Sequence, residues 1–372
     1  MWPHGRADLC YNRRMRHPPY LPRLPRAVIL LCLAPLAVLL DGCGAPVAPA
    51  AVVQAGATGA AGAPTIRLGA GARAVDLLVE PDDGSRALTR AIRAADRSVW
   101  LTMYMLTNHT VVHELEYAHA SGVDVRVILE PHPYGAMDNP NQPAYDNLMA
   151  ADIPVHWSGP RFRLTHEKGM LIDGATAYIM TTNFTHAAFT ANREFDVVDR
   201  APRDVATVRD VFLADWRGRP YAPRASLDGD LPLSPSDARA LLGALIRSAR
   251  RAIDVYGEEL QDAGMERELA RAARRGVRVR VTLPAPAPGT PDYDAAGVRA
   301  VTLAGGRVRR LPRSYLYIHA KAIVVDGRRA FVGSQNLSAA SLDQNRELGV
   351  ILADSDAIRT LEGTFEVDWA HT

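Results

Sequence analysis

Residues 166–173 read HEKGMLID, and residues 319–326 read HAKAIVVD. The two stretches place His, Lys and Asp at the same intervals, and the offset of 153 residues continues beyond them. Further matched pairs are Asn183 with Asn336, Glu194 with Glu347, and Trp216 with Trp369. Two copies at so long a period indicate a duplicated domain, because solenoid repeats are only about 20–50 residues long.

Each copy alternates helical and strand patterns. Apolar residues at helical spacing predict helices at 86–97, 111–121, 237–251 and 265–275. Apolar runs predict strands at 98–106, 123–129, 252–256 and 277–283. Asp173-Gly174 and Asp326-Gly327 each separate two apolar runs, which predicts hairpin turns. The sequence therefore predicts two homologous α/β domains, each a mixed sheet flanked by helices, related by pseudo-twofold symmetry.

The composition is that of a globular protein. The chain has 372 residues, of which 48% are hydrophobic and 23% charged, and this length suits two domains. All three cysteines lie in residues 1–43, so no disulfide is expected in the remainder. The formal charge of +2 comes from the same segment, which has six arginines against two aspartates. The rest carries 37 basic and 39 acidic residues, which argues against broad nucleic-acid affinity.

The N-terminal segment, residues 1–43, has the pattern of an export leader. Residues 27–40 are a 14-residue apolar run behind an arginine-rich stretch, shorter than the roughly 20 residues of a membrane span. The run ends in Leu-Asp-Gly-Cys43, which resembles the lipobox of bacterial lipoproteins except for its Asp. A lipoprotein tethered through Cys43, a signal cleaved elsewhere and an uncleaved anchor are the three interpretations. Each places the protein outside the cytoplasm, in the periplasm or beyond the cell.

Residues 44–73 are rich in Ala, Gly and Pro and predict a flexible linker.

The two lysines are the sharpest chemical signal. The chain contains 41 arginines but only two lysines, Lys168 and Lys321. A compact, rotatable ammonium differs from a guanidinium in how it meets a phosphate oxygen. Because side chains alternate along a strand, each Lys shares a face with the His two residues before it, whereas Asp173 and Asp326 fall on the other face. We therefore expect both aspartates to support a turn.

These blocks resemble the HxKxxxxD motif of the phospholipase D superfamily, and the resemblance covers residues 74–372. It implies phospholipase D-like domains at 74–225 and 226–372. The family motif continues as Gly-Ser-x-Asn, which residues 333–336 match in full, while residues 180–183 read MTTN and lack the Gly. The site residues that the resemblance implies are His166, Lys168, Asn183, Glu194, His319, Lys321, Asn336 and Glu347, with Asp173, Asp326, Thr181 and Ser334 as motif support.

The chemistry implied is phosphodiester cleavage without a metal or a cofactor. One imidazole attacks phosphorus to give a covalent phosphohistidine, and the other protonates the departing oxygen. The lysines and asparagines hold the phosphate oxygens, and the glutamates orient the imidazoles. The resemblance favours His166 as nucleophile and His319 as acid, although the near-symmetry of the copies leaves the assignment open.

The preferred substrate is a phospholipid, hydrolysed at a membrane surface by a monomer. Export, a membrane tether and a net-acidic body support this hypothesis and argue against nucleic acid as a partner. Three alternatives stay open: phosphatidyl transfer to a lipid alcohol, as in cardiolipin synthase, a nuclease of the same family, and a non-catalytic phosphate-binding protein. The last rests on Met180, which stands where the family has Gly.

Overall fold

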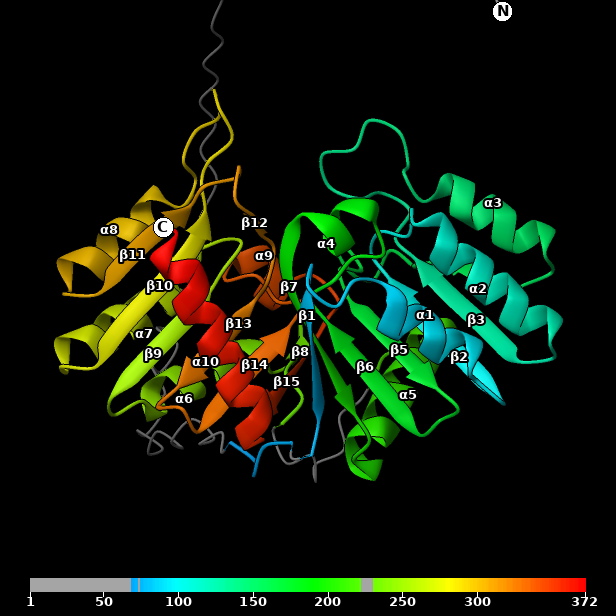
Figure 1. Cartoon of the computed structure of the whole chain (residues 1–372), viewed down its shortest axis with the longest axis horizontal. Helices are drawn as coiled ribbons and strands as arrows, with labels where there is room; N and C mark the ends of the chain where they lie inside the picture. The colour runs from blue at the N-terminus through cyan, green and yellow to red at the C-terminus, as the bar shows by residue number, and fades with distance from the viewer. Residues whose placement is uncertain (1–67, 73, 222–229) are drawn as a thin grey trace, which may run out of the picture. The chain divides into compact units, whose positions relative to one another are not determined.

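The computed structural model describes residues 68–72, 74–221 and 230–372 (Figure 1). The predicted leader with Cys43, most of the predicted linker and the predicted domain boundary at 225/226 lie outside these residues. Within the described part of the chain, no helix has the length and apolar character needed to cross a membrane.

The first sheet mixes parallel and antiparallel pairing. Its own strands are β1 (Asp76–Glu80), β2 (Ser98–Met103), β3 (Asp124–Leu129), β4 (Val155–Trp157), β5 (Lys168–Ile172), β6 (Thr176–Met180) and β7 (Asn192–Asp199). They lie in the order β1-β7-β6-β5-β2-β3-β4, and β2, β3 and β4 pair in parallel. The helices of this half are α1 (Arg86–Arg93), α2 (His109–Ala120), α3 (Gln142–Ala150), α4 (His186–Thr190) and α5 (Pro202–Trp216).

The second sheet repeats this plan. Its strands are β8 (Leu233–Ser234), β9 (Ala252–Tyr256), β10 (Arg278–Pro284), β11 (Arg307–Leu311), β13 (Ala322–Val325), β14 (Arg329–Gly333) and β15 (Glu347–Leu352). Their order, β11-β10-β9-β13-β14-β15-β8, corresponds strand by strand to that of the first sheet. The helices are α6 (Ala238–Ser248), α7 (Ala263–Arg274), α8 (Ala295–Leu303), α9 (Ala339–Asp343) and α10 (Ser355–Ala370). The predicted pair of α/β domains with mixed sheets is confirmed.

The hairpins form where the Asp-Gly pairs predict them. Asp173 and Asp326 have φ angles of 56° and 57°, and the glycine after each has φ of 63°. Two successive positive φ angles match the twist of the flanking antiparallel strands. These turns join β5 to β6 and β13 to β14. They return the chain antiparallel immediately after each His-Lys pair.

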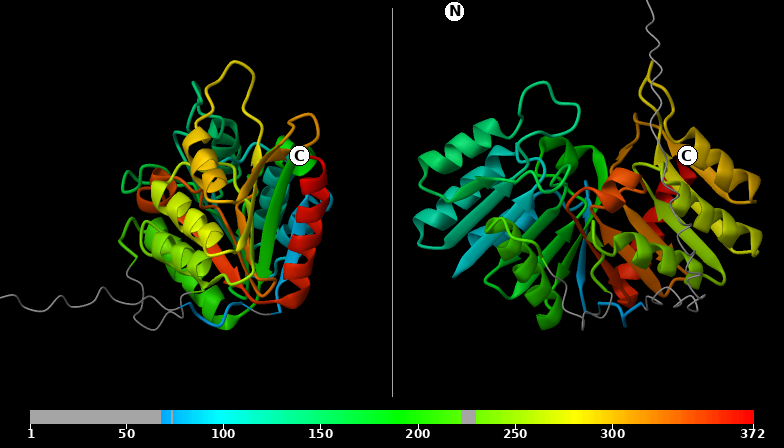
Figure 2. Two further views of the ribbon diagram at one scale, coloured as in Figure 1. Left: turned by 90° about the vertical axis from the view of Figure 1, so that its left-hand side faces the viewer. Right: turned by 180° about the vertical axis from the view of Figure 1, so that it is seen from behind.

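A hydrophobic core common to both halves joins the two sheets. It contains residues from each half, among them Val197, Leu348, Val350 and Phe365, besides the separate core of each half. The helix α10 lies in front of the second sheet in Figure 1, whereas its counterpart α5 lies behind the first and faces the viewer when the molecule is seen from behind (Figure 2, right). This exchange of faces is what a pseudo-twofold axis between the halves produces.

Candidate active site

The motif segments of the two halves meet through exchanged backbone hydrogen bonds. The His166 amide donates to the Arg346 carbonyl at 2.9 Å, and the Ala320 amide donates to the Arg193 carbonyl at 2.9 Å. The short strand β12 (Tyr317–Ile318) leads into the second motif and pairs in parallel with β7 of the first sheet. Each His-Lys segment is therefore positioned by the Asn-Arg-Glu segment of the other half.

Each of the two histidines likewise contacts a glutamate from the other half. His166 Nδ1 lies 2.9 Å from Glu347 Oε2, and His319 Nδ1 lies 2.7 Å from Glu194 Oε1. Both carboxylates are fully buried. The Nδ1 atoms face the glutamates, so the Nε2 atoms are left for chemistry. Sequence reasoning predicted orienting acids, but it did not predict that each acid comes from the opposite half.

Both lysines are buried beside the histidines. Lys168 Nζ donates to the His166 carbonyl at 2.6 Å, and Lys321 Nζ donates in the same way to the His319 carbonyl. Burial, together with the charge of Lys321, lowers the pKa of Lys168 to about 7. The two ammonium groups therefore act on each other electrostatically, as two donors around one anion would.

Burial sets the protonation of the first imidazole. It lowers the pKa of His166 to about 4, against the opposing effect of Glu347. Burial would raise the pKa of Glu347, but His166 and Lys168 outweigh it and lower that pKa. At neutral pH, His166 is therefore a neutral imidazole beside a carboxylate, the form in which a ring nitrogen can attack phosphorus.

The Asn and hydroxyl positions of the motif lie around this centre with unequal contacts. Thr181 Oγ1 donates to Glu194 Oε2 at 2.7 Å, whereas Ser334 Oγ donates to the Leu348 carbonyl at 3.3 Å. Each hydroxyl also accepts a hydrogen bond from a backbone amide, at 2.8 Å for Thr181 and 3.0 Å for Ser334. Asn336 Nδ2 donates to Glu258 Oε2 at 3.3 Å, and Asn183 is buried.

The departure at Met180 has a packing explanation. Its side chain belongs to the core of the first half, and its cross-strand partner is Asp196. Gly333 instead faces Gly349, whose Cα would lie only 2.5 Å from a Cβ at position 333. The second copy therefore requires Gly at this position, whereas the first can hold a long side chain. The difference gives no support to a loss of catalysis.

Asp173 and Asp326 serve the turns. Asp173 accepts hydrogen bonds from the amides of residues 96, 97 and 98, and Asp326 from those of residues 250, 251 and 252. Burial acts to raise the pKa of each, but these hydrogen bonds outweigh it and lower the pKa. Their contacts tie each hairpin to the start of the neighbouring strand.

Two Arg–Asp ion pairs also join the halves beside the reaction centre. Arg193 donates to Asp368 at 2.8 and 3.2 Å, and Arg346 donates to Asp215 at 2.8 and 3.1 Å. Each pair joins the Asn-Arg-Glu segment of one half to the terminal helix of the other. Paired contacts of this bidentate kind fix direction as well as distance.

Two site residues were missed by sequence reasoning. Tyr104 follows β2 and Glu258 follows β9, so they occupy the same position in the two halves, at an offset of 154. The Tyr104 ring lies 4.4 Å from the His166 ring, and Glu258 Oε2 lies 2.8 Å from Lys321 Nζ. Their place just beyond the carboxyl end of a parallel strand was the available signal.

The loop after β3 borders the centre. The Tyr134 amide donates to the Tyr104 hydroxyl at 2.6 Å, which links this loop to the ring against His166. The corresponding loop after β10 is tied to the second motif through Arg313, which donates to the Ala285 carbonyl and lies over the Tyr317 ring. The side chains of Tyr134, Met137 and Tyr293 on these two loops are largely exposed.

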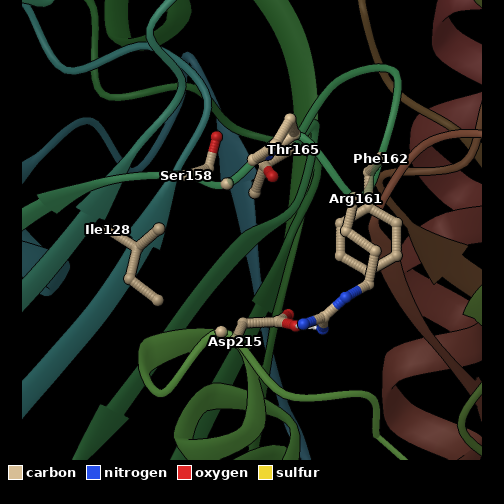
Figure 3. Close-up of a pocket in the computed structure, with 9 residues that line it drawn as sticks. Ile128, Ser158, Arg161, Phe162, Thr165 and Asp215 are labelled. Carbon is tan, nitrogen blue, oxygen red and sulfur yellow. Dashed lines mark ion pairs between the residues drawn. The ribbon is translucent and has the colours of Figure 1, made fainter.

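A cavity of about 350 Å³ adjoins the first motif (Figure 3). Thr165, which precedes His166, lines it together with Ile128, Phe162 and Asp215. Arg161 points toward Asp215, and its Nη1 atom lies 3.7 Å from Asp215 Oδ1 (Figure 3). The lining contains none of the predicted catalytic residues, so this cavity lies next to the reaction centre without being part of it.

Among the described residues, no group of three His, Cys, Asp or Glu side chains is placed to hold a metal ion.

Comparisons with known proteins agree on the family. The family model described as "Cardiolipin synthase, PLD-like domain" matches twice, at residues 88–216 and 242–369. The probable cardiolipin synthase YwiE of Bacillus subtilis is 26% identical over 240 residues, which are 55% of this chain and 45% of that protein. Cardiolipin synthase A of Pseudomonas putida is 24% identical over 333 residues, 79% of this chain and 68% of that one. The human 5'-3' exonuclease PLD3 is 30% identical over 155 residues, 37% of this chain and 31% of that one.

Solved structures support the fold. Phosphatidylserine synthase of Haemophilus influenzae has a TM-score of 0.61 at 12% identity and covers 81% of this chain and 87% of its own. Polyphosphate kinase of Porphyromonas gingivalis has a TM-score of 0.63 at 20% identity, over 80% of this chain and 47% of its own. At these identities the likeness concerns architecture alone.

Proposed function

The chain belongs to the phospholipase D superfamily, and on that premise we propose that it is a phosphatidyltransferase that passes the phosphatidyl group of one phospholipid to the alcohol of another. The observation that carries the proposal is the pair of imidazoles, each held by an acid from the opposite half and each beside a buried lysine. The cardiolipin synthases among its relatives favour transfer over the hydrolysis that the sequence analysis preferred. The chain spans 45% of the Bacillus relative, so the activity of the whole protein is part of the proposal.

The first step forms a phosphohistidine. His166 Nε2 attacks phosphorus, the phosphorus–oxygen bond to the departing alcohol breaks, and His319 gives that oxygen its proton. Glu347 accepts a hydrogen bond from His166 Nδ1 and stabilises the positive charge that the ring acquires. Lys168 and Lys321 balance the negative charge on the phosphate oxygens.

The second step reverses these roles. His319, now neutral, takes the proton of the acceptor hydroxyl, whose oxygen bonds to phosphorus as the bond to His166 breaks. Glu194 stabilises the resulting imidazolium. With water as acceptor the product is phosphatidate, and with a lipid alcohol it is a new phosphodiester.

We also propose that the protein works at a membrane surface, outside the cytoplasm. The export leader supports this location. The exposed Tyr134, Met137 and Tyr293 lie on the two loops that border the centre. Tyrosine side chains favour a lipid–water interface, and Met137 adds exposed apolar surface beside Tyr134. A net-acidic body supports lipid over nucleic acid as substrate.

The test incubates the purified full chain with phosphatidylglycerol vesicles, with and without EDTA, and separately with single-stranded DNA. We expect cardiolipin and glycerol in equal amounts, at the same rate with EDTA, and no product from the variant His166→Ala. Phosphatidate without cardiolipin would show hydrolysis instead of transfer. Nucleotide release alone would overturn the lipid assignment.

A further inference from the structure

Glu258 lies at the reaction centre and has no role in the two-step mechanism. Its Oε2 atom lies 2.8 Å from Lys321 Nζ and 3.6 Å from His319 Nε2, and it accepts a hydrogen bond from Asn336 Nδ2 at 3.3 Å. Its other oxygen, Oε1, accepts from the Tyr317 hydroxyl at 2.9 Å. One carboxylate oxygen is therefore surrounded by three nitrogen atoms of the second motif.

Two of these nitrogens, those of Lys321 and Asn336, are the ones assigned to the phosphate oxygens, and the third, His319 Nε2, is the one that protonates the departing oxygen. A Lys ammonium, an Asn amide and an imidazole Nε2 around one anionic oxygen suit a non-bridging phosphate oxygen as well as a carboxylate oxygen. Resting on the proposed phosphodiester chemistry, we propose that Glu258 occupies the position of a phosphate oxygen in the free site, that substrate displaces it, and that it thereby disfavours phosphates with two negative charges.

The charge of Glu258 is secured by its surroundings. Burial acts to raise its pKa, but His319 and Lys321 outweigh burial and hold the pKa far below its usual range. The carboxylate is therefore ionised whenever the site is free. Once displaced, it stays tethered at the end of β9 near the incoming phosphate. Its repulsion of a dianion is about twice its repulsion of a monoanion, because the energy scales with the product of the charges.

The first half has no such competitor at the matching position. Tyr104 places its ring 4.4 Å from the His166 ring, and Lys168 Nζ lies 4.8 Å from the centre of that ring. Burial raises the pKa of Tyr104 to about 12, so the phenol remains neutral. The Glu258 carboxylate therefore competes with phosphate only for the hydrogen-bond donors of the second motif.

The experiment compares Glu258→Gln and Glu258→Ala with Glu259→Gln in the full chain. Glu259 is the neighbouring carboxylate and accepts a hydrogen bond from Ser338, so it is the matched control. Calorimetry at pH 7.5 measures binding of inorganic phosphate, mostly a dianion, and of dimethyl phosphate, a monoanion. We expect either Glu258 variant to bind phosphate at least about tenfold more tightly than the wild type, with a smaller gain for dimethyl phosphate and no gain in Glu259→Gln.

Unchanged or weaker phosphate binding in both Glu258 variants would overturn the proposal and leave Glu258 as a residue that positions Lys321. Equal gains for the two anions would overturn the charge discrimination. Because binding needs no turnover, a protein that makes no cardiolipin would refute the proposed function without affecting this test. A lower KM on phosphatidylglycerol would support displacement, because competition for the free site raises KM in the wild type.

Discussion

The two halves share one backbone plan but differ in the side chain that faces each His-Lys pair. In the first half Tyr104 presents a neutral ring to His166 and Lys168, whereas in the second Glu258 presents an ionised carboxylate to His319 and Lys321. The geometry of the centre is therefore nearly symmetric, while its electrostatics are not. The comparison teaches that duplicated motifs can supply two chemically different imidazoles without any change in the motif itself.

The largest expected effect separates the two imidazoles. We expect His166→Ala to lose at least about 10⁴-fold in kcat/KM on every diester, since no nucleophile remains. His319→Ala should lose as much on a phospholipid but still release a burst of one nitrophenolate per chain from a p-nitrophenyl phosphodiester, because that group leaves without a proton. Stopped-flow absorbance measures the burst, and melting temperatures check that both variants fold.

The opposite pattern, a burst from His166→Ala alone, would exchange the roles of the two imidazoles. Substantial steady-state turnover of phospholipid by both variants would contradict the mechanism itself.

The next effect is on stability and tests the unlike surroundings of the lysines. Lys168 has a folded pKa of about 7 against an ordinary value near 10.5, so between these pH values the unfolded chain binds a proton that the folded chain does not. Stability should rise with pH over this window, and the penalty should be complete below pH 7. Lys168→Met should therefore raise the free energy of unfolding by about 1–3 kcal/mol at pH 6, less toward pH 10, while abolishing activity.

Lys321→Met is the matched variant with the opposite expected sign. It removes the ammonium partner of Glu258, a partly buried carboxylate that keeps only the Tyr317 hydroxyl and the Asn336 amide as donors, so we expect a loss of about 1–3 kcal/mol. Urea unfolding of both variants at pH 6, 8 and 10 measures the two responses. Equal changes in the free energy of unfolding would mean that the difference between Tyr104 and Glu258 does not affect the two lysines.

The smallest effect concerns the turns, where the halves are alike. Asp173→Ala and Asp326→Ala each remove an acceptor of three backbone hydrogen bonds and place Ala at a positive φ. We expect each to cost about 1–3 kcal/mol of unfolding free energy, similarly in the two halves, with kcat within a few-fold of the wild type. A large loss of kcat in a folded variant would place that aspartate in the chemistry.

Much of this architecture could be predicted because its signals are local. The Asp-Gly pairs indicate the hairpins, and they place Asp173 and Asp326 in the turns and apart from the His and Lys of each motif. The crossing of Glu194 and Glu347 could not be predicted, because a duplicated sequence is equally compatible with pairing inside one half or between halves. Glu258 was missed for a different reason: its counterpart is a tyrosine and the offset changes from 153 to 154, so the comparison of repeats passes over it.

Each catalytic histidine pairs with a glutamate of the other half, and this has a consequence for when the chain becomes active during synthesis. His166 is made long before Glu347, and the first imidazole lacks its acid until that residue has emerged and the second sheet has docked. A nascent or truncated polypeptide therefore carries a first imidazole without its acid, and the proposed mechanism can operate only when both sheets have assembled. The same dependence suits the chain to a split reporter, in which recovered turnover would signal that two separately tethered fragments have come together.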